Sequence, residues 1–373
     1  MIGAQPSTRC VVISAVNFSE GGPLTVLIEC LSAAVETLGS EWKIVALVHD
    51  AALVPQHPRM QVLAFPKPKR SWAKRLGMEW GGGFLALSRE LKPDLWLSLH
   101  DITPRVEARR QVVYCHNPSP FHDLTWREAR IEPSFALFNL FYAHLYRCFI
   151  GRNHAVVVQQ SWLRDEFRRR YGHPQIIVAH PEVRQVAPVA LDEKGDDGRC
   201  VLIYPALPRV FKNFEVLCDA VERLPPQVSA RLDLRLTVDG TENRYARELL
   251  ARYGQVPGLS FIGRQSRQQM AGHYARCAAV LFPSLLETWG LPITEAKALG
   301  KPLVVADLPY AHETVGDCAQ VEFLPPRDPA AWAQTLERIV EGRWSPGGQT
   351  VAMPAQPYTR GWSALWQRLV EGL

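Results

Sequence analysis

The sequence predicts an α/β protein with two domains, each built on a doubly wound parallel sheet. Three observations support this fold class. Short apolar runs of strand type alternate along the chain with helical patterns. The 373 residues exceed what one hydrophobic core usually serves. The alternation lapses once, in the stretch 181–199 rich in Pro, Asp, Gly and Lys, and then resumes. We therefore expect a first domain over 1–184, a second over 185–356 and a C-terminal helix over 357–373.

Composition places the chain among ordinary globular proteins, with 47% apolar and 21% charged residues. The formal charge of +5 is compatible with anionic ligands or lipid surfaces. The cysteines are scattered and form no C-x-x-C pair, so we expect neither a zinc site nor disulfides, and a cytoplasmic location. We expect no signal peptide and no transmembrane segment, because no apolar run has the required length. The run 135–150 contains His144 and Arg147, and we expect it to form a buried helix.

The first expected strand, 9–14, leads into a loop over 17–23 that carries Gly21 and Gly22. Glycine has no Cβ, so backbone N–H groups in such a loop can approach a phosphate. The G-x-G-x-x-G fingerprint of dinucleotide binding is absent, and a double glycine also fits a plain strand–helix turn. A helix is expected over 24–38. The further strands of this domain are expected at 43–48, 61–65, 94–99, 111–115, 155–159 and 175–180.

A histidine follows one of these strands. His116 comes directly after 111–115 and before Asn117, so it lies at the carboxyl edge of the sheet, where ligands of such sheets gather. On spacing alone, a ligand contact and a hydrogen-bonded histidine that fixes a turn are equally good readings. Asn117 and His122 are weaker candidates for binding an acceptor.

The stretch 66–80 interleaves Lys67, Lys69, Arg70, Lys74 and Arg75 with tryptophans. Cations beside tryptophan suit a membrane interface, with the rings at headgroup level and the charges against anionic lipid. A solvated helix with one buried apolar face explains the stretch equally well. Nothing else in the chain favours nucleic acid.

The second domain repeats the pattern, with strands expected at 200–205, 232–240, 259–263, 278–283 and 302–306. Arg209 and Lys212 lie in the loop between the first of these strands and a helix over 214–224. Two cations at the carboxyl end of a strand can neutralise a diphosphate, and they can equally be surface charges.

Another loop, 284–291, leads into a helix expected to begin near Pro292 and to end at Gly300. Glu287 lies in the loop, and Glu295 is expected in the first helical turn. A helix N-terminus favours phosphate, whereas carboxylates accept hydrogen bonds from hydroxyls. A ligand with both groups is a nucleotide-sugar. The alternative is a pair of carboxylates favoured only by the helix dipole.

The stretch 280–305, VLFPSLLETWGLPITEAKALGKPLVV, resembles the E-x7-E segment of GT4 retaining glycosyltransferases. This resemblance implies the GT-B fold, two Rossmann-like domains facing a central cleft, the first for the acceptor and the second for the donor. It implies that Glu287 contacts the donor sugar and Glu295 the ribose. The N–H groups of Gly290 and Leu291 would hold the diphosphate, and Trp289 is the aromatic residue that commonly precedes the GLP turn.

The same resemblance extends to other positions. It implies that His116 contacts the donor sugar near the reacting carbon, and that Arg209 and Lys212 hold the phosphates, although their spacing is shorter than in many members. The base would meet Gly263 and Arg264. The loop with Gly21 and Gly22 would face donor phosphates and acceptor, and a helix over 358–373 would cross back to the first domain.

Together these features predict a retaining glycosyltransferase that uses a nucleotide-sugar, with a GDP-linked donor favoured. The turns ALPRVFKNFE and CHNPSP look closest to bacterial mannosyl- and rhamnosyltransferases of surface polysaccharide assembly. That likeness implies a glycan or lipid-linked glycan acceptor at the cytoplasmic membrane face. A D-x-D motif is missing, so we expect no metal and no other cofactor. The alternatives are a GT-B-fold sugar-nucleotide epimerase and a non-catalytic nucleotide-sugar-binding protein.

Overall fold

A computed structural model describes residues 9–182 and 198–373 and divides them into two compact units. Unit 1 holds residues 9–117, 141–182 and 354–373, and unit 2 holds residues 118–140 and 198–353. Most of the expected linker, 183–197, lies outside the described residues. The segment 118–140 was expected in the first domain, but it packs with unit 2. Residues 354–356, expected in the second domain, pack with unit 1.

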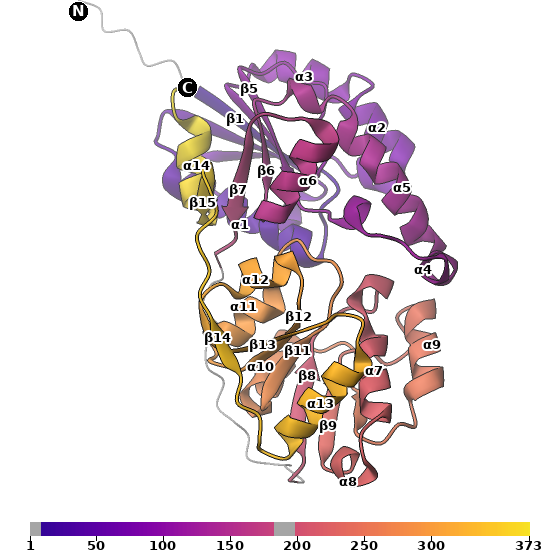
Figure 1. The fold of residues 1–373 in the computed structure, drawn as a ribbon. Coiled ribbons are helices and arrows are strands. Elements are labelled where there is room, and N and C mark those ends of the chain that lie inside the picture. The colour runs from indigo at the N-terminus through magenta and orange to yellow at the C-terminus, as the bar shows by residue number, and fades with distance from the viewer. Residues whose placement is uncertain (1–8, 183–197) are drawn as a thin grey trace, which may run out of the picture. The chain divides into compact units, whose positions relative to one another are not determined.

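Unit 1 contains an eight-stranded parallel sheet in the order β15-β7-β6-β5-β4-β1-β2-β3 (Figure 1). The central strands are buried on both faces, which explains why they read as continuous apolar runs. The order reverses between β1 and β4, so the loops that follow these two strands border the crevice where such sheets bind ligands. The strands are β1 (Arg9–Ala15), β2 (Trp42–Val48), β3 (Met60–Ala64), β4 (Leu95–Ser98), β5 (Arg110–Cys115), β6 (Ala155–Val158), β7 (Ile176–His180) and β15 (Tyr358–Arg360).

Helices cover both faces of this sheet. On one face α1 and α14 bury Leu27, Leu31 and Trp366, and on the other α3 buries Phe84 against Trp96. The chain therefore builds two apolar layers around one sheet. The helices that contribute to unit 1 are α1 (Gly21–Thr37), α2 (Trp72–Glu79), α3 (Gly83–Leu91), α5 (Pro133–Arg147), α6 (Ser161–Tyr171) and α14 (Gly361–Val370), with short 3-10 turns η1 (Ala51–Leu53), η2 (Pro68–Arg70), η3 (Ser119–Phe121, in unit 2) and η4 (Ile150–Arg152) between them.

Three expectations for these elements were wrong. Gly21 and Gly22 form the first turn of α1 and not a loop before it. Helix α5 is not buried all round, because Leu137, Leu140 and Phe141 are each more than half exposed. Only one stripe of α5 is buried against the rest of the protein, so the apolar composition of the helix does not mean that all of its faces are buried. The C-terminal segment begins as strand β15 beside β7, and the helix follows at Gly361.

No helix in the described parts of the chain combines the length and apolarity that crossing a membrane requires.

Unit 2 contains a seven-stranded sheet in the order β10-β9-β8-β11-β12-β13-β14, in which only β14 runs antiparallel. The order reverses between β8 and β11, and both strands are almost fully buried. The loops after these two strands are the ones that carry Lys212 and Glu287. The strands are β8 (Cys200–Tyr204), β9 (Leu232–Leu236), β10 (Leu259–Phe261), β11 (Ala279–Phe282), β12 (Leu303–Ala306), β13 (Cys318–Leu324) and β14 (Gly347–Gln349).

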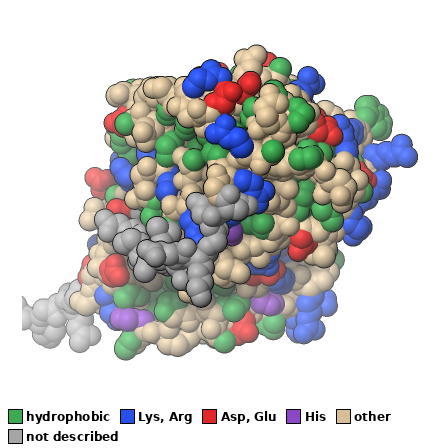
Figure 2. Space-filling model, turned by 90° about the horizontal axis from the view of Figure 1, so that it is seen from below, with side chains coloured by type: hydrophobic (Ala, Val, Ile, Leu, Met, Phe, Trp, Pro, Cys, Tyr) green, Lys and Arg blue, Asp and Glu red, His purple; other side chains and the backbone are tan. Residues whose placement is uncertain are grey.

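The helices that lie wholly in unit 2 range from the 4 residues of α8 to the 12 residues of α13. They are α4 (Trp126–Ile131), α7 (Phe214–Glu222), α8 (Pro226–Ser229), α9 (Arg244–Tyr253), α10 (Arg267–Arg276), α11 (Leu291–Ala298), α12 (Pro309–Val315) and α13 (Pro329–Val340), together with the 3-10 turn η5 (Val210–Lys212). On the face seen in Figure 2, basic, acidic and apolar side chains are interspersed, so the mild positive charge is not concentrated there. The fold class predicted from the sequence, an α/β protein with two doubly wound sheets, is confirmed.

Candidate functional site

The loop after β8 is fixed to the loop after β11 by hydrogen bonds. Asn213, with φ +57, is the N-cap residue before α7, and its amide Nδ2 donates to the carbonyl of Pro283 at 3.1 Å and to that of Pro326 at 2.7 Å. The N–H of Leu285 donates to the carbonyl of Phe211 at 2.8 Å. The two loops at the reversal point of the sheet therefore form one rigid surface.

A cation and a carboxylate meet on this surface. Lys212 and Glu287 form an ion pair, with side chains only 16% and 13% exposed. The ammonium also lies 5.6 Å from the ring centroid of Phe211 and 5.7 Å from that of Phe282. The Tyr204 hydroxyl donates to the Lys212 carbonyl at 2.7 Å and so fixes the backbone of this loop. The structure thus brings together two residues that the sequence predicted separately.

Arg209 is paired with a carboxylate that sequence reasoning missed. Its Nε lies 2.5 Å from Oε1 of Glu132, while the other carboxylate oxygen of Glu132 accepts from the N–H of Val210 at 3.4 Å. The guanidinium also lies over the rings of Phe135 and Phe211, at 5.5 and 5.8 Å. Glu132 is remote from Arg209 in the chain, and no motif surrounds it, so only the fold reveals this pair.

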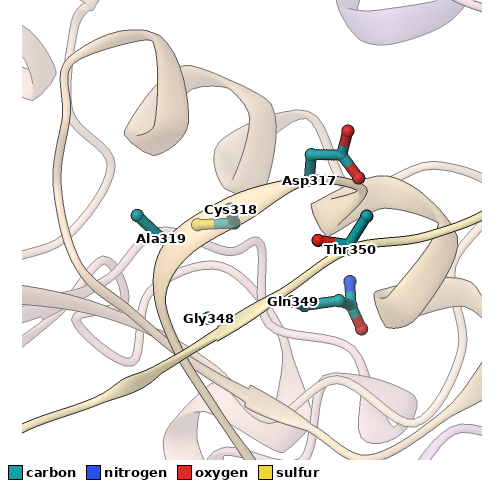
Figure 3. Close-up of a pocket in the computed structure, with 6 residues that line it drawn as sticks. All are labelled: Asp317, Cys318, Ala319, Gly348, Gln349 and Thr350. Atoms are coloured by element: carbon teal, nitrogen blue, oxygen red, sulfur yellow. The ribbon is translucent and has the colours of Figure 1, made fainter.

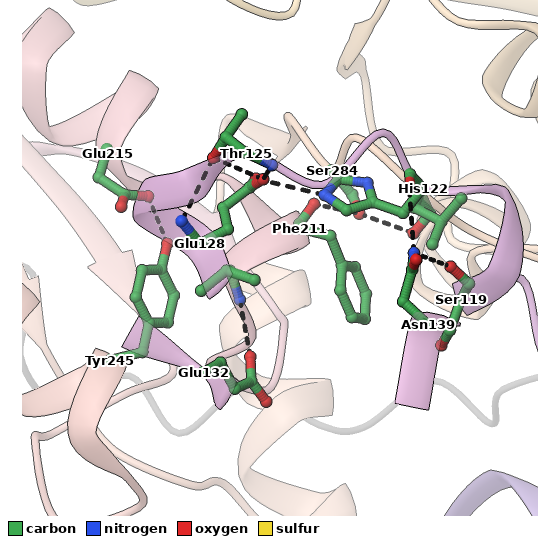
Figure 4. Close-up of polar contacts among 12 residues, drawn as sticks. Ser119, His122, Thr125, Glu128, Glu132, Asn139, Phe211, Glu215, Tyr245 and Ser284 are labelled. Atoms are coloured by element: carbon green, nitrogen blue, oxygen red, sulfur yellow. Dashed lines mark hydrogen bonds and ion pairs between the residues drawn. The ribbon is translucent and has the colours of Figure 1, made fainter. Parts of the chain in front are cut away.

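Glu132 belongs to residues 118–140, which we call the strap and which pack within unit 2 (Figure 4). Two aromatic contacts hold the strap against the loop after β8. The ring of Phe211 lies 6.2 Å from that of His122 and 5.2 Å from that of Phe135. The amide of Asn139 donates to the carbonyls of Ser119 and His122 at 2.5 and 3.0 Å, which closes the strap on itself.

His122, a candidate for the acceptor side, is 8% exposed and faces a carboxylate of its own segment. Its Nε2 lies 3.2 Å from Glu128, whose other oxygen accepts from the N–H of Thr125 at 2.7 Å in a capping box at the start of α4. Burial alone would raise the pKa of Glu128, but hydrogen bonds from His122 and Thr125 lower it to about 2. The observed role of His122 is to anchor the strap.

Helix α11 starts at Leu291, and the expected position of Glu295 changes accordingly. Gly290 adopts φ +83, the left-handed region that favours glycine, and a Cβ there would lie 3.3 Å from the side chain of Ile293. Pro292 lies at the second helical position. Glu295 is the fifth residue and lies in the second turn, so the prediction of the first turn was wrong. Its Oε2 accepts from the Tyr274 hydroxyl at 2.8 Å, which orients the carboxylate.

Trp289 lies inside the protein. It is 7% exposed, and its indole N–H donates to the hydroxyl of Thr294 at 3.0 Å. The Thr314 hydroxyl donates to the Trp289 carbonyl. The observed role of this ring is to support the loop that leads into α11, whereas the adjacent Leu291 is 42% exposed.

Gly263 and Arg264 follow β10, beside the end of β9. Gly263 has φ +66, a backbone conformation that favours glycine, and a Cβ there would come within 2.5 Å of the carboxylate of Asp239 and would displace it. The side chain of Arg264 is exposed. The Gln265 amide donates to the carbonyl of Gly263 at 3.2 Å.

In unit 1, His116 and Asn117 follow β5, as the sequence predicted. The His116 side chain is 15% exposed, and its ring lies 5.4 Å from Phe18, a residue of the loop after β1. The main-chain N–H groups of His116 and Asn117 both donate to the carboxylate of Asp101, at 2.7 and 3.1 Å. Sequence reasoning missed Asp101, although it also follows a strand, β4, and the rule that singled out His116 could have found it.

A second buried cluster lies behind this loop. Arg75, expected as one of the membrane-facing cations, is instead buried and pairs with Glu79 at 2.9 Å. The Nδ1 atom of His100 lies 3.4 Å from Glu79, and its Nε2 is hydrogen-bonded to the hydroxyl of Ser14 at 2.8 Å. Burial raises the pKa of Glu79 to about 7, although Arg75 opposes the shift. Burial, with Arg75 adding to it, lowers the pKa of His100 well below its ordinary value.

Two cavities lie away from these residues. A shallow one of about 480 Å³ is lined by residues 317–319 and 348–350, at the amino end of β13, and Figure 3 shows these six residues. Another of about 200 Å³ adjoins Arg110, His154 and Arg368 in unit 1. Neither includes a predicted site residue. Within residues 9–182 and 198–373, no group of three or more His, Cys, Asp or Glu is placed to hold a metal ion.

Solved structures share this architecture. Sucrose-phosphate synthase from Thermosynechococcus elongatus aligns with 90% of this chain and 90% of its own, with a TM-score of 0.64 and 16% identity. The fold, with two Rossmann-like units and charged side chains at the carboxyl ends of the unit 2 strands, defines the class of GT-B proteins. Residues 192–349 match the family model described as "Glycosyl transferases group 1". This segment, the greater part of unit 2, is therefore similar to the group 1 glycosyltransferases.

Curated relatives align over a similar part of the chain. A D-inositol 3-phosphate glycosyltransferase of Stackebrandtia nassauensis is 30% identical over 154 residues, which are 39% of this chain and 34% of the relative. O-antigen chain mannosyltransferase B of Escherichia coli is 29% identical over 135 residues, 36% of this chain and 35% of the relative. The chain thus spans about a third of the length of these relatives.

Proposed function

We propose that this protein is a retaining glycosyltransferase that moves a hexosyl group from a nucleotide-sugar to a glycan or lipid-linked glycan in surface polysaccharide synthesis. The observation that carries the proposal is the pair formed by Lys212 and Glu287 at the reversal point of the unit 2 sheet. A cation suits a diphosphate and a carboxylate suits hydroxyls, and a nucleotide-sugar carries both groups. The group 1 segment includes both residues, and the relatives named above support the class.

The chemistry follows from where charge develops. When the bond between the sugar C1 and the diphosphate oxygen breaks, negative charge grows on the leaving diphosphate. Arg209, Lys212 and the N–H groups of Gly290 and Leu291 would stabilise that charge by electrostatic preorganisation. In this mechanism Lys212 exchanges Glu287 for phosphate, and Glu287 becomes available to the hydroxyls of the sugar. The scheme needs no metal ion.

The remaining residues take the roles that the resemblance implies. Glu295, already oriented by Tyr274, would bind the ribose hydroxyls. Gly263 and Arg264 would meet the base. On unit 1, His116 would contact the donor sugar near the reacting carbon. The first turn of α1, with Gly21 and Gly22, would serve donor phosphates and acceptor, and Asn117 and His122 the acceptor. Trp289 would act through the loop that it supports.

The experiment starts with the nucleotide. Thermal unfolding is recorded with GDP, UDP and dTDP, because a ligand that binds only the folded state raises its stability. We expect the largest shift with GDP, since an O-antigen chain mannosyltransferase is among the relatives. A larger shift with UDP or dTDP would reassign the base and leave the class intact. No shift with any of them would contradict the proposal.

Transfer is tested next with a Lys212→Met variant. We expect release of nucleoside diphosphate from the GDP-linked hexose to fall at least about 100-fold, the loss typical when a transition-state charge loses its partner. The matched control is Lys301→Met, because Lys301 is also in unit 2 but follows the C-terminal end of α11, where it donates to the carbonyls of Ala275 and Cys277. Equal rates in the two variants would refute the site. Incubation with the donor alone distinguishes a transferase from the sugar-nucleotide epimerase, because only the epimerase would convert the donor to its C2 epimer.

Peripheral membrane contact is part of the proposal, and the candidate surface for it is formed by the cations around η2 and α2 that are exposed. Around η2 and α2 the side chains of Lys67, Arg70, Trp72 and Lys74 are exposed, whereas Arg75 is not. Exposed cations around a tryptophan fit the headgroup region of anionic lipid.

The membrane surface is tested by flotation with vesicles of phosphatidylglycerol and phosphatidylcholine. The variant Arg70→Glu with Lys74→Glu is expected to lose binding. The variant Lys43→Glu with Arg109→Glu makes the same change of charge elsewhere on unit 1 and is expected to retain it. Equal flotation of both variants would remove membrane contact from the proposal.

A further inference from the structure

The loop between β4 and β5 contains a buried carboxylate that no catalytic role above has used. Asp101 adopts φ +71, which a residue other than glycine rarely adopts, and its side chain is 8% exposed. A charged group in such a place is retained only where several donors satisfy it.

Among the described residues, four donors reach the Asp101 carboxylate, all of them in unit 1. Its Oδ1 accepts from the main-chain N–H groups of His116 at 2.7 Å and Asn117 at 3.1 Å. From helix α5, the Tyr146 hydroxyl lies 3.1 Å from Oδ1, and the Tyr142 hydroxyl donates to Oδ2 at 3.1 Å. The Tyr146 hydroxyl also lies 2.9 Å from the carbonyl of Asn117, so its one proton is shared between two acceptors.

The main chain before Asp101 is held as well. The buried guanidinium of Arg75 donates to the carbonyl of His100 at 2.6 Å. Burial alone would lower the pKa of Arg75, but Tyr142, Glu79 and Asp101 raise it, so Arg75 is the buried counter-charge of the cluster. Asp101 is therefore fixed from both sides, by a cation behind it and by hydroxyls from α5.

The imidazole of His116 faces the same carboxylate. Its Nδ1 is buried and has no hydrogen-bond partner among the described residues, and it lies 3.8 Å from Oδ1 of Asp101. That distance is too long for a hydrogen bond, but a carboxylate on this side favours the tautomer with the proton on Nδ1. Phe18 and Tyr114 pack against the ring at 5.4 and 6.0 Å and limit its rotation.

We infer that Asp101 is a positioning residue that fixes the backbone of His116 and Asn117 and sets the tautomer of His116, so that Nε2 is left as an acceptor toward the substrate. This inference rests on the proposed function for its effect on transfer. The tautomer itself does not depend on that function.

The test uses Asp101→Asn, because asparagine has nearly the same shape and tolerates positive φ, while it removes the charge and replaces one acceptor oxygen with an amide donor. The matched control is Asp94→Asn, since Asp94 accepts from the N–H of Cys10 at 2.9 Å at the opposite end of β4. Imidazole ¹⁵N shifts of histidine-labelled protein, assigned with His116→Gln, report the tautomer. We expect the Nδ1–H form in the wild type and in Asp94→Asn, and a shift toward Nε2–H in Asp101→Asn.

Transfer kinetics give the second measurement. For Asp101→Asn we expect kcat to fall about 10- to 100-fold, the size of effect of small misplacements at a reacting centre, with donor KM within about threefold. Circular dichroism establishes that the variants are folded. If Asp101→Asn does not fold, the double variant Tyr142→Phe with Tyr146→Phe removes two donors to the same carboxylate, and a partial tautomer shift is expected.

An unchanged tautomer in the folded variant would overturn the inference, even if kcat falls. A wild type that transfers no sugar would defeat the proposed function, and the NMR measurement would still decide the positioning role. A wild type already in the Nε2–H form would also overturn the inference.

Discussion

Glu132 forms an ion pair with Arg209, the arginine proposed to bind the donor diphosphate, so Glu132 should affect the affinity for nucleoside diphosphate. The ion pair between Glu132 and Arg209 is 2.5 Å long, with side chains 15% and 42% exposed. A diphosphate that binds Arg209 has to displace this carboxylate. Replacing Glu132 with Gln removes the competing charge and keeps an oxygen that can accept from the N–H of Val210.

The expected size follows from the exposure of Arg209. Because its side chain is 42% exposed, solvent screens the pair, which then contributes about 0.2–1 kcal/mol, as surface pairs do. Removing that competition tightens diphosphate binding by the same free energy, or about 1.5- to 5-fold in Kd. The free energy of unfolding should fall by no more than about 1 kcal/mol. The gain should shrink at high salt, because screening already weakens the pair in the wild type.

Titration calorimetry measures this effect, with GDP or whichever nucleoside diphosphate gives the largest thermal shift, at low and high ionic strength. The control is Glu107→Gln, which breaks the exposed 2.8 Å pair between Glu107 and Arg89 in unit 1 and should leave Kd unchanged. Weaker or unchanged binding in Glu132→Gln would refute the competition. If Glu107→Gln tightened nucleotide binding as much as Glu132→Gln, the change in Kd would come from the change in net charge and not from the loss of the ion pair with Arg209.

Three further predictions concern stability and coupling. Burial raises the pKa of Glu79 from 4.5 to about 7, so protonated Glu79 stabilises the folded state fully below pH 4.5, and this stabilisation is lost as the pH rises through 7. Chemical denaturation at several pH values should show the free energy of unfolding fall by on the order of 3 kcal/mol over this range, and Glu79→Gln should abolish that fall. Trp366→Ala removes a fully buried side chain whose indole donates to the Cys30 carbonyl at 3.0 Å, and urea denaturation should show a loss of about 3–5 kcal/mol in unit 1. Lys212→Met leaves the carboxylate of Glu287 without its cation, so the double variant with Glu287→Gln should unfold at higher urea than Lys212→Met alone; a lower midpoint would contradict the pairing.

The candidate site residues of unit 2 were chosen from local pattern, and their roles stay predictions. Arg209, Lys212, Glu287 and Glu295 were predicted as candidates because each follows a strand or lies near a helix start, and parallel sheets gather such residues at one edge. The predicted position of Glu295 within its helix was wrong, because the helix begins at a different residue than expected. Glu295 moved to the second turn because α11 starts at Leu291.

The failures in unit 1 have a different cause. Arg75 looked like a surface cation, because nothing in its sequence neighbourhood indicates the buried Glu79 or the carbonyl of His100 that satisfies it. Helix α5 looked buried because it is apolar, yet its tyrosines turn inward to Asp101 while Leu137 is exposed. Composition reports how apolar a helix is, and only packing decides which stripe of it is covered.

By itself the sequence determined the strand pattern, the presence of two sheets and the loops that carry charged side chains, because these depend on the period of apolar residues and on turn chemistry over a few neighbours. Only the tertiary structure decided which charges meet. The strap packs with unit 2 and brings Glu132 to Arg209, and Asp101 is placed under the backbone of His116. Such pairings join residues far apart in the chain, and their energy depends on burial and distance, which no local pattern records.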